Sequence, residues 1–206
     1  MAFGAPDQTG AQPIMAKARI AILISGRGSN MAALIYATKQ PDCPFEIVLV
    51  AANDPEAAGL RLAQAENLPV FAQSHKGMSR AEFDKILDTQ IRTAQADMII
   101  LAGYMRLLSP EFVALWPARI LNIHPSLLPK YKGLDTHERA LAADDQIAGC
   151  SVHVVTAELD DGEVLAQTEV PVFADDTPDT LASRVLIAEH QTYAPAISAY
   201  IRQLKG

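Results

Sequence analysis

The feature that most constrains the fold of this chain is a short apolar run that ends directly in a glycine loop. Residues 19–25 (Arg-Ile-Ala-Ile-Leu-Ile-Ser) have the isoleucine-rich pattern of a buried strand. Residues 26–30 (Gly-Arg-Gly-Ser-Asn) follow at once, and residues 31–39 have the pattern of a helix. A strand, a glycine loop and a helix in this order open a doubly wound α/β domain, in which ligands bind at the carboxyl ends of the strands.

The same alternation of strand and helix continues along the chain. Further strands are predicted at residues 45–52, 68–71, 98–102 and 120–124, and helices at residues 56–66, 79–94 and after residue 109. Two later strands, at residues 147–155 and 163–172, are joined by an Asp-Asp-Gly turn, and a last helix runs from about residue 177 to residue 204. We therefore expect an α/β fold with a doubly wound, mostly parallel, Rossmann-like sheet and an antiparallel C-terminal strand pair.

The length and charge of the chain limit its organisation and its partners. With 206 residues, 50% of them hydrophobic, we expect a single domain at residues 19–206 behind a flexible extension at residues 1–18. The net charge of −7 and the lack of a Lys/Arg-rich run disfavour nucleic acid as a partner. No apolar stretch is long enough to span a membrane. We expect a cytoplasmic protein with small-molecule substrates, present as a monomer or weak homodimer.

The two cysteines, Cys43 and Cys150, lie far apart and outside any metal-binding spacing. We expect two buried, reduced thiols and no metal site.

The glycine loop at residues 26–30 has the composition of an anion-binding turn. Its backbone N–H groups can approach a phosphate, and the helix that follows presents its positive end. The third glycine of a dinucleotide-binding loop is replaced by Met31, and the Lys-Ser/Thr pair of a P-loop is absent. Phosphate binding and a plain tight turn both remain open for this loop.

Asn122, His124 and Asp160 have the side chains that acyl transfer requires. Residues two apart in a strand point to one face, so the Asn122 amide can stabilise an oxyanion beside an imidazole that moves protons. If the turn at Asp160 folds back against His124, its carboxylate favours the protonated ring and fixes its orientation. The alternatives are a structural hydrogen-bonded pair on the strand and an exposed acid in the turn.

Four segments occur together and in order: residues 22–30 (Ile-Leu-Ile-Ser-Gly-Arg-Gly-Ser-Asn), 101–109 (Leu-Ala-Gly-Tyr-Met-Arg-Leu-Leu-Ser), 121–129 (Leu-Asn-Ile-His-Pro-Ser-Leu-Leu-Pro) and 151–160 (Ser-Val-His-Val-Val-Thr-Ala-Glu-Leu-Asp). In this set the chain closely resembles the phosphoribosylglycinamide formyltransferases of purine synthesis, which use 10-formyltetrahydrofolate. The resemblance extends from about residue 19 to residue 204.

The resemblance implies a role for each matching position. The catalytic trio would be Asn122, His124 and Asp160. The ribotide, phosphoribosylglycinamide, would be held by Gly28, Ser29 and Asn30, with Glu189 near its amine. The folate cosubstrate, 10-formyltetrahydrofolate, would contact Arg80, Met105, Arg106, Leu107, Leu108, Asn122, Thr156 and Asp160. Ser151 and His153 would lie near the site, although a strand histidine is more often structural. The family chemistry needs no metal and no covalent enzyme intermediate.

Three positions depart from the family pattern. Arg27 stands where a small polar residue is common, Asp161 where a glycine is common, and Asp135 where another histidine is common. Arg27 adds a cation to the glycine loop, and Asp161 adds an acid beside Asp160. The role of the third position in binding is left open.

Three other functions remain as alternatives. Formyltetrahydrofolate deformylases carry an extra N-terminal domain, which the residues before Arg19 are too few to form. Methionyl-tRNA formyltransferases add a C-terminal tRNA domain, and the acidity of this chain disfavours tRNA. A non-catalytic ribotide- or folate-binding module has the same fold.

Overall fold

A computed structural model describes residues 16–205, so the expected flexible extension lies almost wholly outside the described residues. Regular structure begins with β1 (Ala18–Ile24). The other strands are β2 (Phe45–Ala52), β3 (Val70–Ala72), β4 (Met98–Leu101), β5 (Ile120–His124), β6 (Ile147–Val154) and β7 (Val164–Pro171). The helices are α1 (Ser29–Thr38), α2 (Gly59–Ala65), α3 (Arg80–Thr93), α4 (Pro110–Leu115), α5 (Thr136–Ala142) and α6 (Pro178–Lys205).

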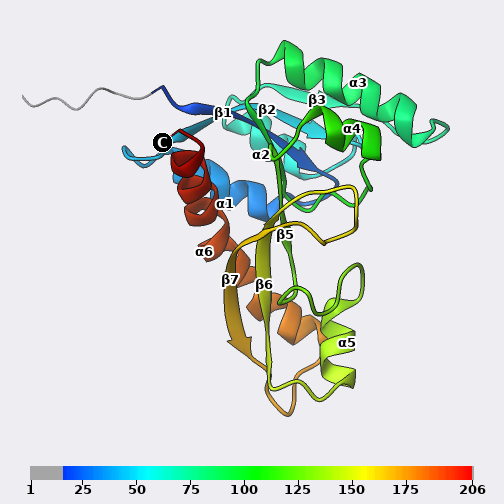
Figure 1. The fold of residues 1–206 in the computed structure, drawn as a ribbon, viewed down its shortest axis with the longest axis vertical. Helices are drawn as coiled ribbons and strands as arrows, with labels where there is room; N and C mark the ends of the chain where they lie inside the picture. Colours follow the sequence, from blue (N-terminus) through cyan, green and yellow to red (C-terminus); the bar gives the residue numbers. More distant parts are fainter. Residues whose placement is uncertain (1–15, 206) are drawn as a thin grey trace, which may run out of the picture.

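One seven-stranded sheet runs through these residues in the order β3-β2-β1-β4-β5-β6-β7 (Figure 1). Strands β1 to β5 pair in parallel, whereas β5 with β6 and β6 with β7 pair in antiparallel fashion. The predicted fold class is therefore confirmed. The chain winds from β1 towards β3 on one side and from β4 towards β7 on the other, so the change of direction falls between β1 and β4. Ligands of such sheets bind at this point.

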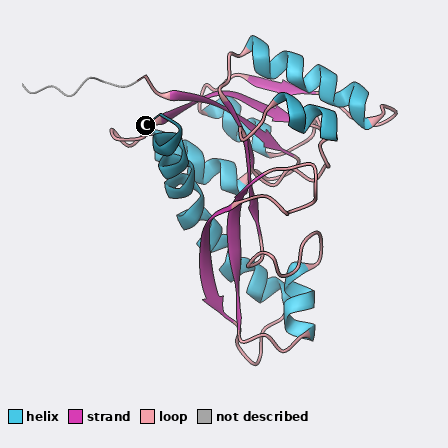
Figure 2. Ribbon diagram, viewed as in Figure 1, coloured by secondary structure: helices cyan, strands magenta, loops and turns pink. Residues whose placement is uncertain are grey.

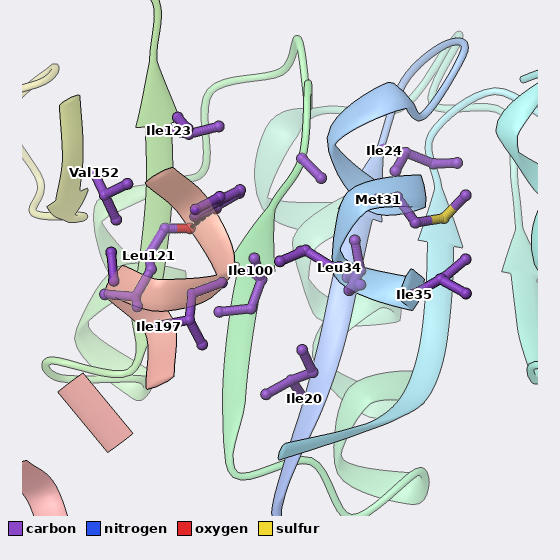
Figure 3. Packing of buried hydrophobic residues seen from close by; sticks show 14 of the residues in the cluster. Ile20, Ile24, Met31, Leu34, Ile35, Ile100, Leu121, Ile123, Val152 and Ile197 are labelled. Atoms are coloured by element: carbon purple, nitrogen blue, oxygen red, sulfur yellow. Dashed lines mark hydrogen bonds between the residues drawn. The ribbon is translucent and has the colours of Figure 1, made fainter. Parts of the chain in front are cut away.

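Helices cover the sheet in two layers (Figure 2). Helices α1 and α6 contribute Met31, Leu34, Leu181 and Ile197 to one hydrophobic cluster, and Figure 3 shows α1 and α6 side chains packed against the sheet there. Helices α3 and α4 bury Phe83, Leu87, Ile91 and Phe112 against the opposite face. The parallel strands are therefore apolar on both faces, as expected for a sheet that is covered twice.

Two helix starts differ from the prediction. Helix α1 begins at Ser29 instead of residue 31, because Gly28 adopts a φ of +71° and serves as its N-cap. Helix α2 begins at Gly59 instead of residue 56, because the Asp54 carboxylate accepts the Glu56 N–H at 3.0 Å and forms a turn there. The predicted capping box of α3 is present, with Ser79 and Glu82 bonded reciprocally.

Both cysteines are buried and free, as the spacing predicted. Over residues 16–205 no helix combines the length and apolarity needed to cross a membrane. The same residues contain no group of three His, Cys, Asp or Glu side chains arranged to hold a metal ion.

Candidate active site

Strand β5 presents Asn122 and His124 on one face, and Asp160 approaches His124 from the connection between β6 and β7. His124 Nδ1 lies 3.3 Å from Asp160 Oδ2. The Asn122 amide nitrogen lies 3.2 Å from His153 Nε2, which in turn is 3.5 Å from Asp160 Oδ1. Strand β5 and the segment at residues 153–160 therefore bring an amide, two imidazoles and a carboxylate together.

The Asp160 side chain is buried, although most of the turn around it is exposed. Asp160 has a φ of +48°, and only 8% of its side chain is exposed. The Gly133 N–H donates to Asp160 Oδ2 at 2.9 Å, which joins this turn to the loop after β5. Burial raises the pKa of the Asp160 carboxyl, but bonds from His153 and Gly133 and the histidine charges outweigh it and leave the pKa below its ordinary value. Asp160 is therefore a carboxylate at neutral pH.

Both ring nitrogens of His124 face acceptors. Nε2 lies 2.9 Å from the Tyr131 carbonyl oxygen, and Nδ1 faces the Asp160 carboxylate. Only the doubly protonated ring has a proton for each of these acceptors. The geometry therefore favours an imidazolium, whose positive charge lies beside Asn122 and which can give up a proton.

His153 has a larger part in the cluster than the sequence indicated. It pairs directly with Asn122 across the antiparallel β5–β6 ladder, and it is 2% exposed. Its Nδ1 lies 3.0 Å from the Val154 carbonyl oxygen, so Nε2 is the nitrogen that meets Asn122 and Asp160. The strand register is the signal that would have identified it. Ser151 instead supports the neighbouring loop, since its hydroxyl donates to the Ser126 carbonyl oxygen at 2.6 Å.

The glycine loop forms a cradle of free N–H groups at the start of α1. The N-cap Gly28 has no side chain, and no acidic residue lies in the first turn of the helix. The N–H groups of that turn and the helix dipole therefore point at an open position that suits an anion. The loop is held from beneath by Gly59, whose N–H donates to the Gly26 carbonyl oxygen at 3.0 Å.

Gly59 is a residue that sequence reasoning missed, and its replacement by alanine is expected to distort the cradle. A Cβ there would lie 2.7 Å from Ile24 Cδ1 and 3.1 Å from the Gly26 carbonyl oxygen. The crowding is expected to destabilise the fold by roughly 1–3 kcal/mol and to weaken binding of a phosphorylated ligand at the loop. Thermal unfolding and anion titration of G59A measure both effects. Unchanged anion affinity in the variant would contradict the assigned role of the loop.

Asn30 connects the cradle to α6. Its amide Nδ2 donates to Glu189 Oε2 at 2.6 Å, across 159 residues of chain. The Asn30 Oδ1 atom is buried and has no hydrogen-bond partner among residues 16–205. Burial raises the pKa of the Glu189 carboxyl above its ordinary value, and the Asn30 bond opposes this only in part. Asn30 therefore has a buried acceptor without a donor, and its amide nitrogen bonds a carboxyl whose pKa is raised.

Glutamine at position 189 is expected to change the pH dependence of stability. Folding raises the pKa of the Glu189 carboxyl, so this group stabilises the fold at pH values below its unfolded pKa. That stabilisation is lost as the pH rises through the folded pKa. E189Q has no such titration, so its stability relative to the parent should increase from about pH 4 to neutrality. Urea unfolding at both pH values tests this. A stability difference that does not depend on pH would show that Glu189 does not titrate in this range.

Helix α6 places Glu189 beside the carboxyl ends of β4 and β5. One turn further along the helix, the buried Tyr193 hydroxyl donates to the Leu101 carbonyl oxygen at 2.8 Å and lies 3.2 Å from that of Leu121. Residues four apart share one face of a helix, so Glu189 points to the same edge of the sheet. Leu121 precedes Asn122, and the glycine loop, which Asn30 joins to Glu189, therefore lies at the same edge as Asn122, His124 and Asp160.

The segment after β4 is the part of the site with the most exposed apolar side chains. Met105 is 71% and Leu107 53% exposed, whereas Leu108 packs against the cluster under α3 and α4. The Arg106 guanidinium lies 5.4 Å from the centre of the Phe83 ring.

Thr156 lies in the β6–β7 connection, where its hydroxyl donates to the Glu158 carbonyl oxygen. Arg80 is the exposed first residue of α3, and within residues 16–205 it forms no hydrogen bond or ion pair with the trio.

Asp161, one of the three positions that depart from the family pattern, directly follows Asp160. Lys132 forms an ion pair with Asp161, parallel to the bond between Gly133 and Asp160. Asp135 is the N-cap of α5, with a φ of +57°, and its side chain makes no capping bond. Arg27 is exposed in the anion loop. The ion pair between Lys132 and Asp161 adds a surface link that holds the Asp160 turn against the loop after β5.

The fold and the site together define a class of protein. A doubly wound sheet, an anion cradle at its first helix and an amide–imidazole–carboxylate cluster at the end of β5 are the parts of an α/β group-transfer protein. Residues 18–197 match the formyl transferase family. The chain belongs to that family.

Named relatives resemble the chain along most of its length. It is 44% identical to the phosphoribosylglycinamide formyltransferase of Escherichia coli K12, over 87% of this chain and 85% of that protein. It is 43% identical to the trifunctional purine biosynthetic protein adenosine-3 of Bos taurus over 88% of this chain. The matched region makes up only 18% of that longer protein. The crystal structure of phosphoribosylglycinamide formyltransferase from Brucella melitensis superposes with a TM-score of 0.85 at 47% identity, covering 89% of this chain and 95% of that one.

Proposed function

We propose that this chain transfers the formyl group of 10-formyltetrahydrofolate to the amine of phosphoribosylglycinamide. The observation that carries the proposal is the meeting of Asn122, His124 and Asp160 at the sheet edge that Glu189 also reaches. The cradle at Gly28, Ser29 and Asn30 supplies a site for the phosphate of the ribotide. The likeness to named phosphoribosylglycinamide formyltransferases supports the choice of substrates.

In the proposed reaction the substrate amine attacks the formyl carbon and forms a tetrahedral oxyanion. Asn122 Nδ2 donates a hydrogen bond to that oxygen, and the positive charge of the His124 imidazolium stabilises it electrostatically. The carbon–nitrogen bond to the folate then breaks, and the proton lost by the amine reaches the departing folate nitrogen through His124. The Asp160 carboxylate keeps His124 oriented and stabilises its positive charge. No residue of the chain forms a covalent bond to the formyl group.

Each substrate has its own group of residues in this proposal. Glu189 and the unpartnered Asn30 Oδ1 accept hydrogen bonds from the ribotide amine. The folate lies along Met105, Arg106, Leu107, Leu108 and Thr156, with Arg80 reaching its acidic end. The single domain at residues 19–206, the monomer or weak homodimer and the cytoplasmic location stay predictions.

The function is tested by following the absorbance change of the folate with and without the ribotide. Turnover that depends on phosphoribosylglycinamide supports the proposal. Folate turnover with water alone would assign a deformylase instead. Binding of both ligands without any turnover would assign a binding module.

A further inference from the structure

The loops after β1 and β4 meet where the winding of the sheet changes direction, and Ser25 joins them. The Ser25 N–H donates to the Gly103 carbonyl oxygen at 3.2 Å. The Met105 N–H donates to the Ser25 hydroxyl oxygen at 2.8 Å. Ser25 directly precedes the anion loop, so one residue borders both halves of the candidate site.

The Ser25 hydroxyl is held in turn by Asn53, the residue that follows β2. The hydroxyl donates to Asn53 Oδ1 at 2.7 Å, and Asn53 is only 5% exposed. A hydroxyl that already donates to one group presents its lone pair to the next. Asn53 therefore directs the acceptor side of Ser25 towards the Met105 N–H.

His75 holds Asn53 from the segment after β3. Its Nδ1 lies 3.2 Å from Asn53 Nδ2 and 2.9 Å from the Asn53 carbonyl oxygen. The ring packs edge-on against Phe83, with 6.2 Å between ring centroids. The ends of three successive strands thus supply one continuous hydrogen-bonded network that ends on the backbone of Met105.

The segment at residues 105–108 depends on this network because burial holds only its alternate residues, Arg106 and Leu108. Met105 and Leu107 are 71% and 53% exposed. At the far end the Ser109 N–H donates to the buried Asp84 carboxylate at 2.7 Å. The segment is therefore anchored by hydrogen bonds at both ends, with Ser25 as the anchor next to the anion loop.

We infer that Ser25, Asn53 and His75 are positioning residues that hold the 105–108 segment in the conformation that binds the folate. This inference rests on the proposed function, which places the folate along that segment. The three residues act through the Met105 backbone and touch no reacting atom. Loss of the network should therefore weaken folate binding and leave the ribotide site unchanged.

Ser25→Ala tests the inference by binding, using tetrahydrofolate and phosphoribosylglycinamide as separate probes in calorimetry. The folate Kd is expected to rise roughly tenfold, because a backbone N–H and a buried amide oxygen lose their partner. The ribotide Kd is expected to change less than about twofold, and S25T, which keeps a hydroxyl, should restore folate binding. Ser74→Ala is the matched control, since the exposed Ser74 hydroxyl bonds only to the Lys76 N–H.

A second variant keeps the inference testable if S25A does not fold. His75→Ala removes the outermost, half-exposed member of the network and should raise the folate Kd roughly threefold, again without an effect on the ribotide. Unchanged folate binding in either folded variant, or an equal loss for both ligands, would overturn the inference. Because binding is measured without turnover, a parent protein that binds both probes but transfers no formyl group would refute only the proposed function.

Discussion

Replacement of His124 by alanine is expected to lower kcat by on the order of a thousandfold. The change removes the imidazolium that faces both Asp160 and the Tyr131 carbonyl oxygen, and with it the positive charge near the oxyanion and the proton carrier. The two KM values should change far less, because the phosphate cradle and the 105–108 segment do not use this ring. Steady-state kinetics with each substrate varied in turn measure the split.

A second histidine provides the control for this variant. His137 lies on α5, and its Nε2 atom is buried without a hydrogen-bond partner. His137→Ala should keep kcat within about threefold of the parent, because among residues 16–205 the His137 ring makes none of the bonds that hold His124 and Asp160 in place. Near-normal turnover in H124A, with the fold confirmed by circular dichroism, would remove the imidazole from the proposed chemistry.

The sequence was sufficient to predict the elements and part of the site. Local patterns identified every strand, the capping box at Ser79 and the shared face of Asn122 and His124. These features depend on residues within one turn or one strand, where periodicity and capping chemistry are informative. The predicted starts of two helices were wrong. The observed starts, at Ser29 and Gly59, depend on backbone conformations that side-chain patterns specify poorly.

Long-range pairings were beyond the reach of the sequence patterns. The position of His153 beside Asn122 follows from the β5–β6 register, and no local signal sets that register. The closeness of Asn30 to Glu189 depends on how α6 packs beside α1. No sequence pattern indicated that Asn53 is buried in a network with Ser25 and His75. Residue types suggested the chemistry, whereas tertiary packing determined which of them meet.

Asparagine at position 160 is expected to lower kcat by about a hundredfold or more while the fold stays intact. One oxygen, Asp160 Oδ2, faces both the Gly133 N–H and His124 Nδ1, whereas Oδ1 faces His153 Nε2. An amide oxygen in the place of Oδ2 can keep both contacts, but the neutral amide removes the negative charge beside His124. The variant therefore stabilises the imidazolium less, and pre-steady-state rates at saturating substrates measure the resulting loss of oxyanion stabilisation.

The adjacent acid makes the Asp160 test specific. Asp161 pairs with Lys132 at the surface, so Asp161→Asn should change kcat by less than about threefold. The pH dependence of stability gives an independent test. Folding lowers the pKa of the Asp160 carboxyl, so this group stabilises the protein above its unfolded pKa. The stabilisation is lost as the pH falls through the folded pKa. The unfolding free energies of the parent and D160N should therefore differ at neutral pH and converge in acid. Equal turnover in D160N and D161N would mean that the charge at position 160 does not act on His124.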